Sequence, residues 1–217
     1  MANIQIGAAA GTTLGNPPSG DFYIFIDSDN VNAYTLRDSS GTDTILGSAN
    51  PATLYGLYSQ TVQSATITNT VTETSIVGTG VGSLTVPADF FTVGDSYHGK
   101  IGGVISAQNG DDVTLRIKTG TTVLASTGAI SLSPVTGLGW ELELDFTIAA
   151  IGATGTICTN GNFAYNRDTG SLEGFVFQDV QAIDTTSANT LDITVEWGQA
   201  KTQDQIYSAN FVLYKTY

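Results

Sequence analysis

Residues 139–148, with the sequence GWELELDFTI, decide the fold class of this 217-residue chain. Large apolar side chains occupy every second position from Trp140 to Ile148, and three carboxylates and a threonine stand between them. Successive side chains of a β-strand point to opposite faces, so this stretch predicts a strand with one apolar face and one acidic face. The apolar face needs a second sheet to cover it, whereas the acidic face needs water.

Two further stretches, residues 113–117 and 191–197, alternate in the same way and can supply the covering sheet. Turn-forming Asn, Asp and Gly residues separate most of the expected strands, as at residues 109–111 and 119–121. No apolar repeat of helical period persists long enough to compete. We therefore predict an all-β chain in which residues 73–217 form an antiparallel β-sandwich.

The charge of the chain restricts its partners. Twenty acidic residues against seven basic ones give a net charge of −13, and Arg37 is the only basic residue before Lys100. Nucleic acid and anionic membrane surfaces need clustered Lys and Arg, so both are excluded as partners, whereas a neutral glycan or a basic protein surface is not. No apolar stretch approaches the roughly 18 residues of a membrane span. The first residues lack the basic and apolar regions of a signal peptide, which predicts synthesis in a cytoplasm.

The chain divides into four predicted segments. Residues 1–20 are rich in Gly, Ala and Thr and cannot pack a core, so we expect an extended segment that either orders on a larger assembly or stays floppy. Residues 21–48 predict a small β module, which buries too little to be secure as a monomer. Residues 49–72 predict a stem or a flexible linker. Residues 73–217 form the expected β-sandwich head.

Several motifs resemble a pattern found in phage and large-virus fibre proteins. They lie at residues 81–88 (VGSLTVPA), 93–97 (VGDSY), 115–118 (LRIK), 139–143 (GWELE) and 152–156 (GATGT). Residues 18–27 and 38–42 resemble a short module near the start of phage tail and head fibre chains, and the likeness covers most of residues 17–48 and 73–165. It implies a homotrimer with a jelly-roll or tumour-necrosis-factor-like head, held to capsid or tail proteins through residues 1–20.

Residues suited to catalysis are sparse. His98 is the only histidine and Cys158 the only cysteine, which excludes the usual zinc sets, and no Gly-x-Ser-x-Gly motif occurs near His98. Cys158 is expected as a small buried hydrophobe. Glu141 and Glu143 would stand about 6.5–7 Å apart on one strand face, a spacing compatible with a glycosidase pair. Exposed alternation explains both glutamates better, so we expect no enzyme activity and no cofactor.

Three groups of oxygen-bearing side chains raise the question of calcium: residues 27–32 (DSDNVN), 111–112 and 160–162. In the first group Val31 occupies a position where a calcium loop needs a ligand, and no glycine follows it. The other two groups are isolated. Turn chemistry accounts for all three, so we predict no metal site.

A recognition surface is expected around the irregular stretch that begins near residue 160. Its candidate receptor-facing residues, which could hydrogen-bond to or stack on a sugar or a protein, are Asn160, Asn162, Tyr165, Asn166 and Arg167. Phe163 lies among them, and Phe175 and Phe177 are expected in the core. The final run, residues 211–217, is apolar on both faces, which is typical of a strand buried at a subunit interface.

These features predict a virion structural protein without enzymatic activity. In this interpretation a homotrimeric fibre or spike displays the β-sandwich head for host attachment, and its repeated heads multiply weak contacts with a host glycan or protein. Two alternatives remain open. One is a capsid decoration or cement protein that binds no host, and the other is a glycan-degrading tailspike enzyme.

Overall fold

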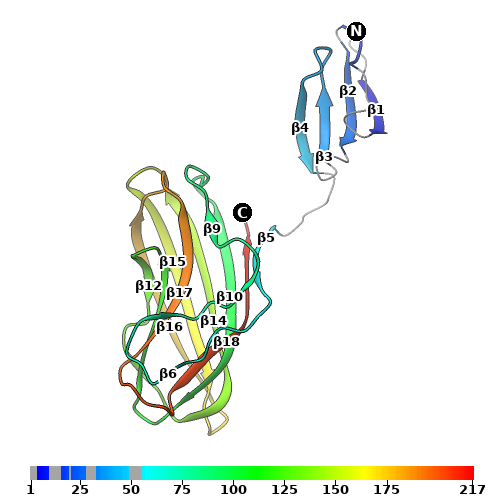
Figure 1. Ribbon diagram of the computed structural model, residues 1–217. Coiled ribbons are helices and arrows are strands. Elements are labelled where there is room, and N and C mark those ends of the chain that lie inside the picture. The colour runs from blue at the N-terminus through cyan, green and yellow to red at the C-terminus, as the bar shows by residue number, and fades with distance from the viewer. Residues whose placement is uncertain (1–3, 10–15, 20, 28–32, 49–54) are drawn as a thin grey trace. The chain divides into compact units, whose positions relative to one another are not determined.

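The computed structural model describes residues 4–9, 16–19, 21–27, 33–48 and 55–217 (Figure 1). The described residues form β-strands and their connections, which confirms the predicted all-β class. None of them belongs to a helix long and apolar enough to cross a bilayer. The chain forms two compact units, residues 1–53 and residues 54–217.

The first unit contains a four-stranded sheet in the order β1-β2-β3-β4. Its strands are β1 (Ile4–Ala9), β2 (Phe22–Asp27), β3 (Ala33–Arg37) and β4 (Asp43–Ser48). β1 pairs in parallel with β2, and the other pairs are antiparallel. The predicted boundary at residue 20 is therefore wrong for residues 4–9, because they belong to the small module. Parallel pairing between distant segments leaves no local turn signal, which is why the sequence did not indicate this strand.

The small sheet buries Phe25, which is 1 % exposed. The Arg37 guanidinium lies 5.3 Å from the centre of the Phe25 ring, a cation–π contact. The turn after β3 is closed by Asp38, whose Oδ1 accepts hydrogen bonds from the backbone N–H groups of Ser40 and Thr42, both at 2.9 Å. These contacts give the small module an internal structure of its own.

The second unit is a sandwich of two antiparallel sheets. The larger sheet has the order β16-β15-β14-β10-β18-β5-β8, with β6 also paired to β18. The smaller sheet has the order β12-β11-β17-β7, with β13 on β11 and β9 on β17. The strands are β5 (Tyr55–Gln60), β6 (Ile67–Thr68), β7 (Thr74–Ser75), β8 (Gly80–Gly82), β9 (Thr85–Val86), β10 (Ser96–Ala107), β11 (Asp112–Thr119), β12 (Thr122–Ser126), β13 (Ile130–Ser131), β14 (Val135–Ala150), β15 (Gly155–Asn166), β16 (Leu172–Ile183), β17 (Asn189–Trp197) and β18 (Gln205–Lys215).

The strand pairing is that of a jelly roll. The first strand of the sandwich, β5, pairs with the last, β18, and the next segments, β7 and β9, pair with β17. Further inward, β10 pairs with β14 and β11 with β12. This nesting of early strands on late ones is the double Greek key of jelly rolls, so the predicted head fold is confirmed. The hairpin of β15 and β16 extends the larger sheet beyond β14.

The core lies between the inner faces of the two sheets. The five apolar side chains of β14 from Trp140 to Ile148 are each at most 7 % exposed, as their alternation predicts. Leu115 of β11 and Val195 of β17 are 0 % exposed and cover them from the smaller sheet. The two inner faces form one continuous apolar cluster, which is the arrangement expected of a β-sandwich.

The expected stem is wrong for residues 55–72, and residues 49–54 lie outside the described residues. β5 is a strand of the larger sheet, and Tyr58 and Ile67 are buried in the core. Two polar side chains of this stretch, Gln60 and Ser64, are buried as well and bind β18. The Gln60 Nε2 group donates to the hydroxyl of Ser208 at 3.0 Å, and the Ser208 N–H group donates to the Ser64 hydroxyl at 2.9 Å. These hydrogen bonds allow the two polar side chains to lie inside the fold.

Candidate functional site

The predicted receptor-facing residues lie in and just after β15, which is a regular strand and not an irregular stretch. Asn160, Asn162 and Asn166 are exposed on the outer face of the larger sheet. The side chain of Tyr165 lies on the opposite, inner face of the strand and is 0 % exposed. Its prediction as a receptor-facing residue is therefore wrong. Its hydroxyl donates to the carboxylate of Glu173 at 2.6 Å and accepts the backbone N–H group of Ser133 at 2.7 Å.

Arg167 does not share the outer face with the asparagines. Its side chain is half-buried, and its Nε atom lies 3.9 Å from the Glu173 carboxylate. The Arg167 backbone N–H group donates to the carbonyl of Ser171 at 2.9 Å, which closes the turn between β15 and β16. Arg167 therefore holds this turn against β16.

Lys100, Glu143 and Asn162 form a polar row across β10, β14 and β15, because the strand register places them side by side. The Lys100 ammonium lies 3.1 Å from the carboxylate of Glu143 and 2.8 Å from that of Glu141. Hydrogen bonds to Glu141 and then to Glu143 raise the pKa of Lys100. The two carboxylates that the sequence offered as a glycosidase pair therefore share one ammonium.

A second row joins His98, Asp145 and Asn160 on the same three strands. The imidazole Nδ1 lies 2.8 Å from the Asp145 carboxylate, and the ring packs against Tyr214 with the centres 5.1 Å apart. A histidine oriented by an acid is two-thirds of a catalytic triad. Within the described residues, however, no hydroxyl forms a hydrogen bond with His98, and the hydroxyl of Ser96 on the same strand bonds Thr147 at 2.9 Å.

The outer face continues onto β16, the edge strand of the larger sheet. Leu172, Val176 and Val180 are 67, 81 and 62 % exposed there. Cys158 of β15 is exposed on the same face and pairs in register with Val180. The prediction of Cys158 as a buried hydrophobe is therefore wrong, because its side chain points to the same outer face as that of Asn160.

The inner face of β16 carries Phe175 and Phe177, which are half-buried and pack against the core as predicted. Phe177 pairs in register with Gly161 of β15, and a Cβ atom on Gly161 would stand 2.3 Å from the Phe177 ring. Gly161 is therefore required by this close approach, which explains the glycine between Asn160 and Asn162.

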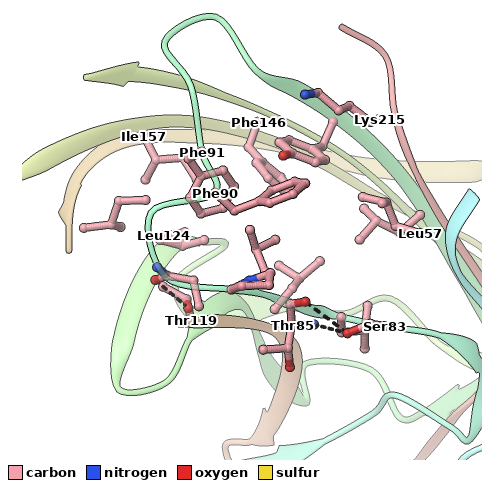
Figure 2. A pocket seen from close by; sticks show the side chains of 18 of the residues that line it. Leu57, Ser83, Thr85, Phe90, Phe91, Thr119, Leu124, Phe146, Ile157 and Lys215 are labelled. Carbon is pink, nitrogen blue, oxygen red and sulfur yellow. Dashed lines mark hydrogen bonds between the residues drawn. The ribbon is translucent and has the colours of Figure 1, made fainter. Parts of the chain in front are cut away.

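An apolar pocket of about 550 Å³ opens between the two sheets at one end of the sandwich (Figure 2). Its floor consists of buried side chains from both sheets: Leu124, Phe146, Ile157, Leu191 and Leu213. The segment before β10 forms one wall and places Phe91 inside and Phe90 at the surface, 6 and 59 % exposed. The sequence shows no single motif for this pocket, because its lining comes from many separate strands and connections.

Polar groups at the rim of the pocket bind one another. The hydroxyl of Ser83 donates to the carbonyl of Thr85 and accepts its N–H group, at 3.0 and 2.9 Å. The hydroxyl of Thr119 donates to the side-chain oxygen of Asn189 at 3.2 Å. Figure 2 shows the rings of Phe90, Phe91 and Phe146 gathered on one side of the pocket, away from Ser83, Thr85 and Thr119.

A buried acidic pair lies between the β10–β11 turn and the β17–β18 connection. Asp111 and Asp204 are 2 and 1 % exposed, and the ammonium of Lys201 binds Asp111. The two carboxylate oxygens of Asp204 accept no hydrogen bond from the described residues. Burial, reinforced by the carboxyl group of Asp111, raises the pKa of Asp204 to about 6. In the described part of the chain no three His, Cys, Asp or Glu side chains gather as metal ligands.

The predicted absence of calcium at residues 27–32 concerns positions that lie almost wholly outside the described residues.

No protein-family model matches the sequence, and no curated protein matches it significantly. The chemistry of the outer face and the fold of the head are therefore the basis for a functional inference.

Proposed function

We propose that this protein is a virion structural protein, a homotrimeric fibre or spike that displays its jelly-roll head for host attachment. The observation that carries the proposal is the outer face of the larger sheet, where polar side chains in register form an open surface on a rigid jelly roll. The resemblance of the sequence to viral fibre chains supports the virion location.

The outer face has the chemistry of a surface that binds neutral hydroxyl-rich molecules. Asn160 and Asn162 each offer an amide donor and an amide acceptor, and both are exposed. Asp145 and Glu143 stand beside them as further acceptors, each held in place by a basic partner. Because the chain carries a net charge of −13, a neutral or cationic receptor is favoured over an anionic one.

The groups best suited to catalysis are engaged in contacts that orient the surface. Glu141 and Glu143 both bind Lys100, and His98 is held between Asp145 and Tyr214. These contacts lie on an open sheet face, where water reaches them. They support recognition in preference to hydrolysis.

Assembly into a trimer would serve attachment by avidity, because linked heads convert weak single contacts into tight binding. The exposed apolar side chains of β16, at Val176 and Val180, offer surface for contact between copies. We assign anchoring to capsid or tail proteins to residues 1–20, of which residues 4–9 form β1 of the small module.

Two measurements on the full chain test this proposal. Light scattering should give three times the chain mass of 22.6 kDa, and a mass of one chain would contradict the trimer. On an array of neutral and charged polysaccharides, the wild type should bind a neutral glycan and Asn162→Arg should lose at least tenfold in affinity. Asn109→Arg, the same change in the exposed β10–β11 turn, is the matched control and should bind as the wild type does. Equal binding by both variants would overturn the outer face as the receptor surface.

One observation favours a second candidate function, a capsid decoration protein. β16 is a long edge strand, paired among the described residues only with β15, and it exposes Leu172, Val176 and Val180. Such an edge can add to another protein's sheet and cement a shell. A charge at its centre, Val176→Lys, would then abolish shell binding. Release of reducing sugar by the wild type, lost in Glu143→Gln, would instead establish a glycan hydrolase.

A further inference from the structure

The pocket between the sheets is an exception within a well-packed core. Protein interiors leave few voids larger than one water molecule, and an unfilled void costs the contacts that its lining would otherwise make. The pocket measures about 550 Å³, within the range of roughly 300–1,000 Å³ that is typical of small-molecule sites. A void of this size in an otherwise continuous apolar cluster points to an occupant.

The lining of the pocket defines the shape of that occupant. Leu124 and Leu191 from the smaller sheet face Phe146 and Leu213 from the larger one, and all four are at most 7 % exposed. A flat protein surface would reach only the rim, whereas a slender molecule can reach the floor. Phe90 at the mouth is 59 % exposed and can pack against the part of the ligand that remains outside the floor.

The polar groups around the pocket define the charge of the occupant. The hydroxyls of Ser83 and Thr119 are already hydrogen-bonded to Thr85 and Asn189. The one cationic lining residue, Lys215, lies 2.6 Å from the carboxylate of Asp95, and the pair carries no net charge. An anionic head group would have to displace Asp95, and the chain as a whole repels anions because its net charge is −13.

We propose that this pocket binds an uncharged, slender apolar molecule, of the class of a fatty alcohol or the hydrocarbon chain of a neutral lipid. The hydrocarbon chain lies between the two sheets and the hydroxyl end remains at the rim near Phe90. Binding requires no bond formation and no change in the fold. This site is separate from the outer face and does not depend on the function proposed for it.

The test uses the full chain and the uncharged fluorophore N-phenyl-1-naphthylamine. Its fluorescence should rise to saturation at one molecule per chain, dodecanol should displace it, and dodecanoate should displace it at least tenfold less well. Leu191→Trp fills the floor and should lower the affinity at least tenfold. Val62→Trp, a similar enlargement at an exposed position outside the pocket, is the control and should leave the affinity unchanged.

Circular dichroism checks that each variant is folded. If Leu191→Trp does not fold, Phe90→Ala replaces it, since Phe90 is mostly exposed and its loss should weaken binding several-fold. The proposal is overturned if the wild type shows no saturable binding, or if the folded pocket variants bind as tightly as the wild type. It is also overturned if the pocket variants lower the mass of the assembly, because the pocket would then be a contact between subunits.

Discussion

The two ends of the head sandwich differ in what lies between the sheets: an apolar pocket at one end and a buried acidic pair at the other. Tyr97, near the start of β10, lines the apolar pocket, and β10 ends at Ala107, just before the turn that holds Asp111. At the first end the sheets leave about 550 Å³ unfilled between apolar walls, and the rim hydroxyls of Ser83 and Thr119 are hydrogen-bonded to Thr85 and Asn189. At the second end Asp111 and Asp204 are buried side chains, and the ammonium of Lys201 binds Asp111.

The two ends therefore lower the stability of the fold for different physical reasons. Missing apolar contacts at the pocket end cost packing energy that a ligand can restore. Buried carboxyl groups at the other end cost solvation energy that depends on pH and on Lys201. The same strand therefore connects a region that responds to apolar ligands with a region that responds to protons.

The largest expected effect is on the free energy of unfolding, and it differs between the packed centre of the core and the pocket wall. Leu142→Ala removes a side chain that is 0 % exposed and should lower the free energy of unfolding by about 4 kcal/mol, because it creates a new cavity. Leu191→Ala enlarges a void that already exists and should cost roughly half as much. Denaturant unfolding measures both. Equal losses would mean that the pocket end is as tightly packed as the centre.

The next effect concerns the charge balance of the acidic pair. Lys201→Met removes the ammonium that binds Asp111 and leaves two buried carboxyl groups without a cation. The free energy of unfolding at pH 7 should fall markedly, and by more than in the surface control that follows. Lys100→Met is the matched control on the outer face, where Lys100 is about half exposed, and it should cost less than about 1 kcal/mol. Similar losses for both variants would contradict the distinction between a buried and a surface ion pair.

A smaller effect should appear in the pH dependence of stability. The pKa of Asp204 is about 6 in the folded chain against 3.8 ordinarily, so the folded state binds a proton that the unfolded state releases. Its contribution to stability is full below pH 3.8 and is lost as the pH rises through 6, by about 2 kcal/mol between pH 4.5 and 6.5. Asp204→Asn removes this dependence, so the wild-type curve should fall relative to the Asn curve over that range. Parallel curves would show that Asp204 is ionised throughout.

The smallest effect on stability belongs to the outer face. Asn162→Ala exchanges an exposed amide and should change the free energy of unfolding by less than about 0.5 kcal/mol. Under the proposed function the same variant should weaken glycan binding. A large loss of stability would mean that the amide serves the sheet and not a receptor.

Most of what could be predicted from the sequence came from the alternation of side chains between the two faces of a strand. It placed Trp140 to Ile148 in the core and the intervening carboxylates outside, and the structure agrees. The same rule, applied to β15, would have placed Tyr165 inside and Cys158 outside. Both predictions failed because alternation was not applied along residues 158–165, where Asn160 and Asn162 mark the outward face and Gly161 lies on the inward one.

Other features left no local signal. The strand at Tyr55–Gln60 was expected in a stem or linker, because no local pattern indicates that the distant Ser208 hydroxyl satisfies the buried Gln60. The apolar pocket likewise depends on lining residues from strands that meet only in the folded chain. Asp204 looked like an ordinary loop residue, since its burial beside Asp111 depends on how two connections meet.

The pairing of β5 with β18 sets the order in which the head can be completed. Lys215 is in register with Tyr55, so the two segments that meet are separated by nearly the whole length of the sandwich. On the ribosome, Tyr55–Gln60 therefore emerges long before its partner exists, with one edge unpaired and open to chaperones or to a neighbouring nascent chain. Completion of the head is thus slow, since contacts between distant segments form late.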